Sequence, residues 1–281
     1  MGFGSRLTEA MDKFGPLSVG IDPSPTMLAH WGLPDTPEGV LTLGQAVTEA
    51  CDRSVAAVKL QIAFFERHGA RGIAALEKVL EAARHYNLLT IMDAKRGDID
   101  TSMTGYAEAY LKPGAPLEVD AMTVSPFLGV GSLEPAFTLA KENGKGVFVL
   151  CLTSNPEGPT IQHAKDEDGT AVATSIAAAV AEWNQDAKPM GDIGLVIGAT
   201  TGDAVRSLPV PLYLVNGPIL APGVGAQGAR IEQLTEMFKG ASKRVLAHQS
   251  RAVLESGPFV EKLRGSIRAA SEAAYYALRG E

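Results

Sequence analysis

The chain has 281 residues, of which 46% are hydrophobic and 20% charged, and its formal net charge is -7. This composition is typical of a globular protein with a large core, and the lack of a Lys/Arg-rich run argues against nucleic acid as a partner. No run of 18 uncharged apolar residues predicts a membrane span, and residues 1–16 lack the apolar core of a secretory signal, so we expect a cytoplasmic location. Cys51 and Cys151 lie in apolar stretches and are expected in the core, and no histidine pair has metal-binding spacing.

Short apolar runs alternate along the chain with amphipathic runs whose apolar residues recur every three or four positions. The predicted strands are Leu17–Ile21, Ala56–Leu60, Leu88–Met92, Ala121–Val124, Gly146–Leu152, Ile193–Gly198, Pro218–Ala221 and Arg244–Ala247. The predicted helices are Leu43–Arg53, Gly69–Tyr86, Ser102–Tyr110, Leu133–Glu142, Val172–Asp186, Arg230–Phe238 and Phe259–Leu278. A competing apolar run, Val210–Val215, leaves the start of the seventh strand open.

This alternation favours parallel strands joined by crossover helices, and eight such units predict an α/β protein with a (β/α)8 barrel, or TIM barrel, as a single domain over residues 1–281. An open doubly wound sheet is the alternative. Two observations weigh against it: Asp22-Pro23-Ser24-Pro25 follows the first strand in place of a glycine-rich turn, and polar residues follow most strands. The polar segment Asn155–Thr170 is long enough for a mobile loop over a site.

The segment Asp93-Ala94-Lys95-Arg96-Gly97-Asp98-Ile99 places four charges directly after the third predicted strand. Active sites of barrels lie at the carboxyl ends of the strands, although a solvated turn would also tolerate such charges. A lysine flanked by carboxylates stays protonated, so Lys95 suits a general acid. Lys59 ends the neighbouring strand and is expected to join Asp93, Lys95 and Asp98 in one network, unless it only extends its ammonium group to solvent.

Other strand ends carry groups suited to a sugar phosphate. Asp22 can accept a sugar hydroxyl, although Asp before Pro also forms turns. Pro222–Gly228 offers backbone N–H groups of Gly223 and Gly225 and the amide of Gln227, and Ser250-Arg251 follows the eighth strand, which together indicate a phosphate site; a surface turn is the alternative.

Ser154 lies in Thr153-Ser154-Asn155-Pro156, where Asn-Pro marks a turn. No base follows at a spacing that would suggest a nucleophilic serine. Hydrogen bonding to the edge of a heterocycle is therefore the favoured function for Ser154, with a structural role in the turn as the competing interpretation.

Together these motifs resemble the orotidine 5'-phosphate decarboxylase family, over nearly the whole chain. The resemblance rests on Asp93-x-Lys95-x-x-Asp98-Ile99, Gly20-Ile21-Asp22-Pro23, Lys59-x-Gln61-x-Ala63-Phe64-Phe65-Glu66, Thr153–Gly158 and Pro222–Gly228. Phe64-Phe65-Glu66 and Ser154–Gly158 are similar to the longer bacterial branch, which includes the actinobacterial enzymes.

The resemblance implies decarboxylation of orotidine 5'-phosphate to uridine 5'-phosphate and CO2, the final step of pyrimidine nucleotide synthesis, without cofactor or metal. It implies that Lys95 protonates C6, that Asp93 lies beside the departing carboxylate and that Lys59 holds Asp93 and a ribose hydroxyl. Asp98 is implied to act in the partner's site, which makes the protein a homodimer. The substrate-binding residues that the resemblance implies are Asp22, Ser102, Ser154, Gly223, Gly225, Gln227, Ser250 and Arg251.

The chain departs from the family pattern at Leu60, Asp100 and Ala229, and Ala247–Ser250 is more polar than usual. No proposed catalytic group is lost, so these departures bear on affinity and loop closure. Two other functions stay open: a metal-dependent aldolase or epimerase acting on a sugar phosphate, which EDTA would inactivate, and a nucleotide-binding barrel without catalysis, which would bind uridine 5'-phosphate with no turnover.

Overall fold

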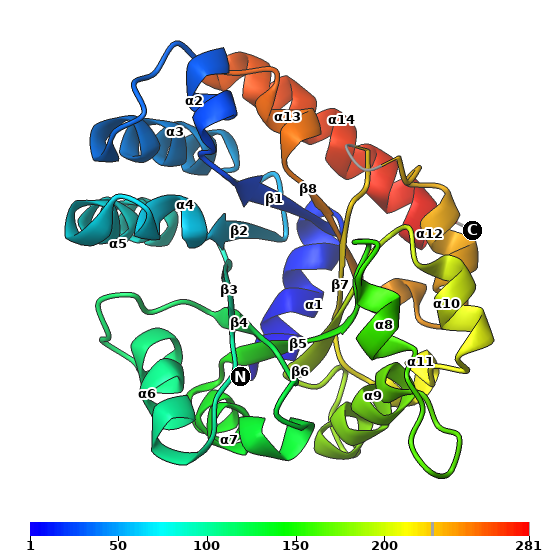
Figure 1. Ribbon diagram of the computed structural model, residues 1–281. Helices are drawn as coiled ribbons and strands as arrows, with labels where there is room; N and C mark the ends of the chain where they lie inside the picture. Colours follow the sequence, from blue (N-terminus) through cyan, green and yellow to red (C-terminus); the bar gives the residue numbers. More distant parts are fainter. Residues whose placement is uncertain (226–227, 281) are drawn as a thin grey trace.

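The computed structural model describes residues 1–280 apart from 226 and 227, and within them eight parallel strands form a closed barrel in chain order (Figure 1). The strands are β1 (Leu17–Ile21), β2 (Ala57–Gln61), β3 (Thr90–Arg96), β4 (Ala121–Val124), β5 (Gly146–Leu152), β6 (Ile193–Ile197), β7 (Ile219–Pro222) and β8 (Val245–Gln249). β1 also pairs with β8, so the sheet has closed on itself. The predicted TIM barrel is confirmed and the open doubly wound sheet is wrong.

Strand β3 differs most from its predicted boundaries. It runs from Thr90 to Arg96, so Asp93 and Lys95 lie within the strand and the expectation that they follow it is wrong. The charges are tolerated because the two side chains pair with each other and with neighbouring strands in the barrel interior, while the backbone continues its ladder with β2. β8 likewise extends to Gln249, which brings His248 into the strand.

The outer layer of the barrel consists of helices that alternate with the strands. These helices are α3 (Pro37–Ala50), α5 (Gly69–His85), α6 (Asp100–Leu111), α7 (Glu134–Asn143), α9 (Val172–Trp183), α12 (Gln233–Met237) and α14 (Val260–Arg279). α3 begins at Pro37 and not at the predicted Leu43, because the Thr36 side chain accepts a hydrogen bond from the Gly39 N–H at 3.3 Å and Pro37 fits the first turn.

Short helices occur in the loops between the main elements. They are α2 (Pro25–His30), α4 (Ala63–Glu66), α8 (Gly158–Gln162), α10 (Gly202–Ser207), α11 (Leu212–Val215) and α13 (Arg251–Leu254), with 3-10 turns η1 (Val130–Leu133) and η2 (Ser242–Arg244). The competing run Val210–Val215 therefore contributes a helix and not a strand. The segment Asn155–Thr170 contains α8, and Lys165 within it pairs with Ala171 in an antiparallel bridge, so the segment is more ordered than a featureless loop.

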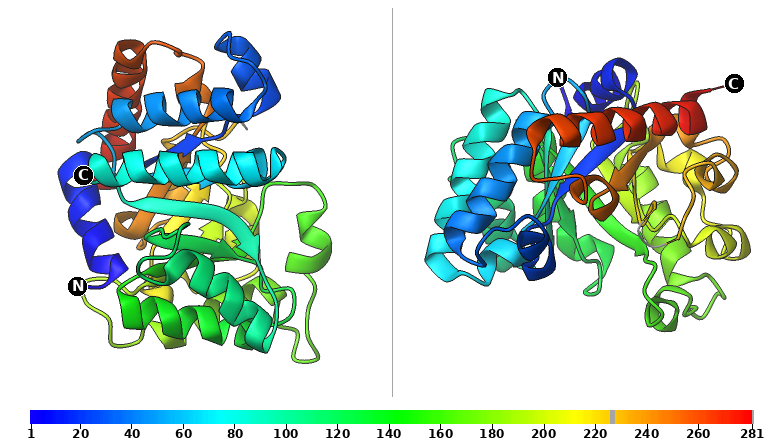
Figure 2. Two further views of the ribbon diagram at one scale, coloured as in Figure 1. Left: turned by 90° about the vertical axis from the view of Figure 1, so that its left-hand side faces the viewer. Right: turned by 90° about the horizontal axis from the view of Figure 1, so that it is seen from above.

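Helix α1 (Phe3–Phe14), which the sequence analysis did not predict, covers one end of the barrel (Figure 2). Phe3, Leu7 and Met11 are fully buried and recur every four residues, so they share one helix face. They pack against apolar side chains near the amino ends of the strands, among them Ala57, Ile91, Ala121, Phe148 and Leu246. A Cβ on Gly146 would lie 2.2 Å from Phe3 Cδ1, so the bare glycine makes room for this ring.

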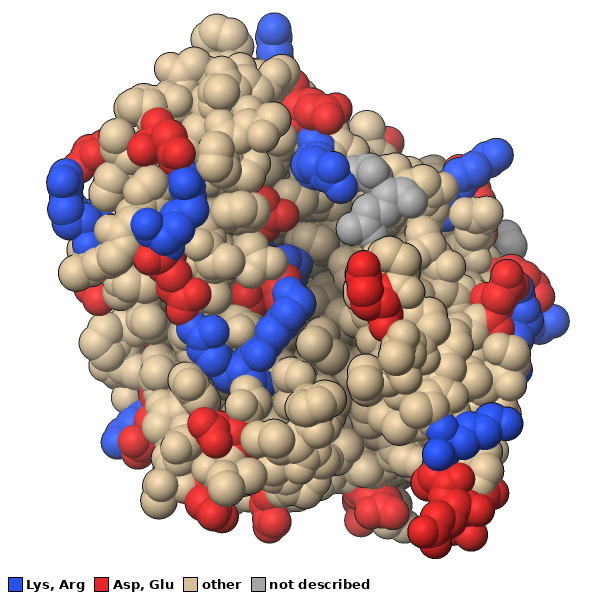
Figure 3. All heavy atoms as spheres, in the orientation of Figure 1, with Lys and Arg blue, Asp and Glu red and all other residues tan. Residues whose placement is uncertain are grey.

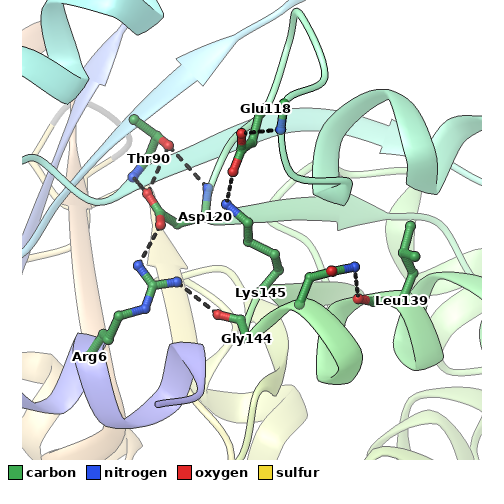
Figure 4. Close-up of polar contacts among 9 residues, drawn as sticks. Arg6, Thr90, Glu118, Asp120, Leu139, Gly144 and Lys145 are labelled. Carbon is green, nitrogen blue, oxygen red and sulfur yellow. Dashed lines mark hydrogen bonds and ion pairs between the residues drawn. The ribbon is translucent and has the colours of Figure 1, made fainter.

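A polar network fastens α1 to the same end of the barrel (Figure 4). Arg6 donates to Asp120 Oδ1 at 2.5 Å and to the Gly144 carbonyl at 2.8 Å. The other oxygen of Asp120 accepts hydrogen bonds from the Thr90 backbone N–H at 2.9 Å and the Thr90 hydroxyl at 3.0 Å. The amino-terminal end of the barrel is therefore closed by both apolar packing and paired charges.

Both cysteines are buried, as predicted, and they do not form a disulfide. Burial raises the pKa of the Cys151 thiol to about 12, and it also raises that of Cys51. Neither thiol is therefore ionised near neutral pH. Among the described helices, none has the length and apolar character that crossing a membrane requires.

Candidate active site

A cavity of about 300 Å³ opens at the carboxyl ends of the strands. Figure 3 shows this face hollowed near its middle, with basic and acidic side chains next to one another in the hollow. The predicted site residues that line the cavity are Asp22, Lys59, Asp93, Lys95, Ser154, Gly223, Ser250 and Arg251. All eight strands, or the loops at their carboxyl ends, supply its lining, as expected of a barrel active site.

Asp93 lies at the centre of a hydrogen-bond network on the charged side of the cavity. Lys59 Nζ donates to Asp93 Oδ2 at 2.7 Å, and Gln61 Nε2 donates to the same oxygen at 3.1 Å. Lys95 Nζ donates to Asp93 Oδ1 at 2.5 Å, and the Thr123 hydroxyl donates to that oxygen at 3.0 Å. Four side chains from β2, β3 and β4 therefore fix one carboxylate. Of the expected four-residue network, Lys59, Asp93 and Lys95 come together within a single chain and Asp98 does not.

The charges in this network maintain one another. Burial by itself raises the pKa of Asp93, but the ammonium groups of Lys59 and Lys95 outweigh it and hold that pKa well below its usual range. Burial by itself lowers the pKa of Lys59, but Asp93 and Asp22 outweigh it and raise the pKa of Lys59. The cavity lining thus combines the carboxylates of Asp22 and Asp93 with three basic side chains, those of Lys59, Lys95 and Arg251, and this excess of basic groups suits an anionic ligand.

Lys95 is directed into the cavity by an irregularity in β3. The pairing of β3 with β4 shifts register between Met92 and Arg96, and Lys95 has a left-handed backbone with φ of 47°. Its backbone N–H donates to Thr123 Oγ1 at 2.9 Å, which stabilises this conformation. A left-handed non-glycine residue is strained, and such strain concentrates at functional sites. The Lys95 side chain is 46% exposed and that of Lys59 only 5%, so of the two lysines Lys95 is the one that a ligand can reach.

Two buried oxygen atoms in the cavity lack a hydrogen-bond partner among the described residues, Asp22 Oδ1 and Ser250 Oγ. An unsatisfied buried polar atom costs about 1–3 kcal/mol, so two of them in one cavity indicate positions that a ligand completes. Gly20 of β1 lies against Ser250, and a Cβ there would be 2.6 Å from Ser250 Cβ. The glycine therefore lets the end of β8 approach β1 closely.

The loop after β7 and the start of α13 form the side of the cavity where a phosphate is expected. Gly223 and Gly225 have φ of 100° and 79°, values that favour glycine. Gly223 and Arg251 line the cavity, whereas Gly225 does not; its N–H donates to the Ala229 carbonyl at 2.8 Å. Gln227 lies outside the described residues, so its predicted role is not tested by the structure.

The opposite wall of the cavity is apolar. It is formed by Leu150, Leu152, Val196 and Leu220 from β5, β6 and β7, and Ser154 lies at its upper edge after β5. A flat heterocycle fits between such an apolar wall and a set of polar groups, because its faces are apolar while its edge makes hydrogen bonds. The cavity therefore has a charged side, an apolar side and a rim with N–H donors.

Asp98 and Ser102 are not among the residues that line the cavity. Asp98 Oδ1 accepts a hydrogen bond from the Ile99 N–H at 2.8 Å, and Ser102 is exposed on α6. Within one chain the structure therefore separates these two predicted residues from Asp93 and Lys95, although they are close in sequence.

Three polar residues of the cavity that lie within strands, Gln61, Thr123 and His248, were given no role by the sequence analysis. They occupy inward-facing positions, because side chains alternate along a strand and each lies two residues from another inward residue. His248 Nδ1 lies 3.4 Å from Ser18 Oγ. Burial, and then the positive charge of Lys59, hold the pKa of His248 well below its usual value, so the ring is neutral.

The departures from the family pattern at Leu60, Asp100 and Ala229 lie outside the cavity, whereas His248 and Ser250 of the more polar segment Ala247–Ser250 line it. Leu60 is fully buried in the core beneath the outer helices. Asp100 is exposed at the start of α6 with φ of 47°. Ala229 is buried and pairs with Val224 through the backbone, next to the predicted phosphate loop. Only Ala229 is placed where it can affect that loop directly.

Comparisons with known proteins agree on one family. The family model described as "Orotidine 5'-phosphate decarboxylase / HUMPS family" matches residues 15–265. The chain is similar to proteins named orotidine 5'-phosphate decarboxylase from Streptomyces coelicolor, at 50% identity over 262 residues and 93% of each chain, and from Salinispora arenicola, at 48% over 264 residues and 94% of each.

Solved structures give the same result. A crystal structure from Streptomyces avermitilis has a TM-score of 0.94 at 49% identity and covers 99% of this chain and 96% of that one. The structure of Leishmania donovani OMP decarboxylase has a TM-score of 0.78 at 28% identity and covers 99% of both chains. The similarity therefore includes every strand that contributes to the cavity.

Proposed function

We propose that this chain, which belongs to the orotidine 5'-phosphate decarboxylase family, decarboxylates its substrate with the Lys59–Asp93–Lys95 network and without a metal or organic cofactor. The reaction converts orotidine 5'-phosphate to uridine 5'-phosphate and CO2 in pyrimidine biosynthesis. The observation that carries the proposal is the ionised, buried Asp93 between the ammonium groups of Lys59, whose side chain is 5% exposed, and Lys95, whose side chain is 46% exposed.

Lys95 is the proposed proton donor. When the bond between C6 and the carboxylate breaks, CO2 leaves and the electron pair stays on C6, in the plane of the ring, where the π system cannot absorb it. An ammonium group already aimed at C6 stabilises this charge as it forms, which is selective for the transition state. The proton then moves from Lys95 Nζ to C6, and the resulting amine regains a proton from water.

Asp93 and Lys59 are proposed to hold Lys95 in place. Asp93 accepts a hydrogen bond from the Lys95 ammonium group, and Lys59 keeps Asp93 ionised. The proton donor, Lys95, is therefore oriented before the substrate binds. In this arrangement Asp93 also lies beside the departing carboxylate. Repulsion between the two carboxylates would add to the rate.

The remaining cavity residues are proposed to bind the nucleotide. Asp22 is assigned to a ribose hydroxyl, because its buried Oδ1 lacks a partner in the described residues. Ser154 is assigned to the pyrimidine edge, because it lies at the rim of the apolar wall. The phosphate is assigned to Gly223, Gly225, Gln227, Ser250 and Arg251, of which Gly223, Ser250 and Arg251 line the cavity.

We further propose a homodimer in which Asp98 and Ser102 serve the partner's site. Neither residue reaches the cavity of its own chain. Next to them, the large apolar side chains of Ile99, Phe127 and Leu128 are 53%, 75% and 53% exposed. Exposed apolar side chains of this size near a functional segment indicate an interaction surface. A second copy placed on this surface would bury them and receive Asp98.

A cytoplasmic location is part of the proposal. Its support is the pair of unbridged cysteines, because reducing compartments keep thiols free.

The proposal is tested by following the loss of orotidine 5'-phosphate absorbance with the wild type and with Lys95→Ala. We expect kcat to fall at least about 10⁴-fold, because the variant loses both the proton donor and the charge that stabilises C6. Lys78→Ala, which removes an exposed lysine from α5, is the matched control and should leave kcat unchanged. If Lys95→Ala stays within about tenfold of the wild type, or about 1.4 kcal/mol in barrier, Lys95 is not the donor.

EDTA addresses the cofactor part of the proposal. Activity should survive extended treatment with the chelator, and its loss, reversed by a divalent metal, would favour the metal-dependent alternative. Uridine 5'-phosphate binding without any turnover of orotidine 5'-phosphate would instead favour a binding protein.

The shared site is tested by mixing Lys95→Ala with Asp98→Ala chains after mild unfolding and refolding. Each homodimer should be inactive, and mixed dimers should regain activity because one of their two sites combines an intact Lys95 with an intact Asp98 from the other chain. Proven heterodimers with no recovered activity would rule out the sharing of Asp98.

A further inference from the structure

Arg96 lies in the middle of the Asp93–Ile99 segment, and the function proposed above gives it no role. Its guanidinium forms an ion pair with Glu66 of α4. The same group lies 5.6 Å from the centroid of the Tyr106 ring on α6 and donates to the Ala94 carbonyl at 3.2 Å. One side chain therefore connects β3 to a helix on either side of it, in the arrangement that Figure 1 shows for β3, α4 and α6.

The backbone of Arg96 is the point at which regular sheet pairing resumes. The register of β3 against β4 shifts between Met92 and Arg96, and Arg96 is the next residue paired, with Val124. The Ser125 N–H donates to the Arg96 carbonyl at 2.8 Å. The strained Lys95 is thus fixed on one side by Asp93 and on the other by Arg96.

Tyr110 adds a further contact to the cluster. Burial raises the pKa of Tyr110, while the positive charge of Arg96 and a hydrogen bond from it oppose this shift. The side chain of Arg96 is 26% exposed and that of Glu66 is 41% exposed. Ion pairs this open to solvent contribute little to the free energy of unfolding. The cluster therefore matters mainly for the position of the end of β3.

We propose that Arg96 is a positioning residue that holds the end of β3 in the conformation in which Lys95 enters the cavity and Asp98 leaves toward the partner. This inference rests on the function proposed above. A planar guanidinium can bind a carboxylate, a carbonyl and a ring face at the same time, whereas the compact ammonium of lysine cannot. The pairing also gives a function to Glu66, the last residue of the Phe64-Phe65-Glu66 motif.

The test compares Arg96→Met, Arg96→Lys and Glu66→Gln with the wild type. We expect Arg96→Met to lower kcat about 10²-fold, the loss produced by a misplacement of about 1 Å, while KM and the Kd of uridine 5'-phosphate change less than about threefold. Glu66→Gln should lower kcat in the same direction but less, and Arg96→Lys should recover only part of the loss. Arg71→Met is the control, because Arg71 also pairs with a glutamate, Glu38 at 2.7 Å, but on helices away from the cavity.

A second measurement does not depend on activity. Backbone amide exchange of Lys95 and Ser125 should become at least about tenfold faster in Arg96→Met, because both amides depend on the fixed end of β3, with global stability checked by thermal unfolding. Unchanged kcat together with unchanged exchange would overturn the inference, and so would equal changes in kcat and KM. If the wild type itself fails to turn over orotidine 5'-phosphate, the proposed function falls, and the exchange rates still decide whether Arg96 fixes the strand.

Discussion

Two aspartates at opposite ends of the barrel have similar hydrogen-bond partners but different roles. Asp120 accepts hydrogen bonds from Arg6 and twice from Thr90, and it lies beneath α1. Asp93 accepts from Lys59, Gln61, Lys95 and Thr123, but it borders an open cavity. The closed end balances one anion with one cation. The cavity at the open end is lined by three basic and two acidic side chains, and one of the basic side chains, that of Lys95, is 46% exposed. A surplus charge beside an empty space, and not a charge network alone, is what marks the functional end.

The largest difference between the two ends of the barrel is expected between the variants Asp93→Asn and Asp120→Asn. We expect Asp93→Asn to lower kcat at least about 10²-fold, because Lys95 loses its orienting partner. Asp120→Asn should leave kcat unchanged but lower the free energy of unfolding by about 1–3 kcal/mol, because Arg6 loses its charged partner. Steady-state kinetics and urea unfolding measure the two effects. Similar kinetic losses in both variants would mean that the two ends are not functionally distinct.

Thr123→Val removes one hydroxyl without changing the shape of the side chain. We expect kcat to fall about 10–10²-fold, since Thr123 holds both Asp93 Oδ1 and the Lys95 backbone N–H. The rate of absorbance loss at saturating substrate gives this value. Thr104→Val, on the exposed face of α6, serves as the control for the same substitution. Wild-type kcat in Thr123→Val would show that Lys95 needs no support from β4.

Gly146→Ala tests the closed end. The new Cβ would meet Phe3 at 2.2 Å, so we expect a loss of about 1–3 kcal/mol of unfolding free energy from overpacking, with kcat unchanged. Gly265→Ala in α14, where a Cβ meets open space, should instead stabilise the protein by about 0.5–1 kcal/mol. Denaturant unfolding of the two variants decides the matter, and equal stabilities would argue against tight packing of α1.

His248 gives the smallest predicted effect, and it appears only in acid. Its pKa in the folded protein lies well below the value of 6.5 expected when unfolded, so below about pH 6.5 the unfolded chain binds more protons. The free energy of unfolding should therefore decrease as the pH is lowered below about 6.5, by up to about 1.4 kcal/mol per pH unit. In His248→Gln the contribution of this residue to the pH dependence should be absent. Urea midpoints at about pH 7.5 and 5.5 measure it. A parallel pH dependence in the variant would contradict a neutral buried ring.

The barrel could be predicted from the sequence because each strand is a short apolar run between amphipathic helices; the limits of β1, β4 and β5 agree with the structure. The limits of β3 could not be predicted, because charged residues usually mark the end of a strand. Only the closed barrel shows that the side chains of Asp93 and Lys95 pair in its interior. Helix α1 precedes the repeating units, so no strand–helix alternation indicated it.

The candidate site follows the same logic. Charged residues at strand ends, such as Lys59 and Asp93, stand out in an apolar context. Thr123 and Gln61 do not, because a single neutral polar residue in a strand indicates nothing until the register places it beside Asp93. The separation of Asp98 from the cavity also depends on the path of the chain after β3, which the bulge at Lys95 sets.

The position of α1 determines how substrate enters and product leaves the cavity. Since Phe3, Leu7 and Met11 fill the amino-terminal end of the barrel, the described residues give the cavity a single mouth, at the carboxyl ends of the strands. Substrate enters and the nucleotide product leaves by the same route. Uridine 5'-phosphate that stays in the cavity blocks the next substrate molecule. The closure of the barrel by α1 therefore makes inhibition by the product competitive with the substrate.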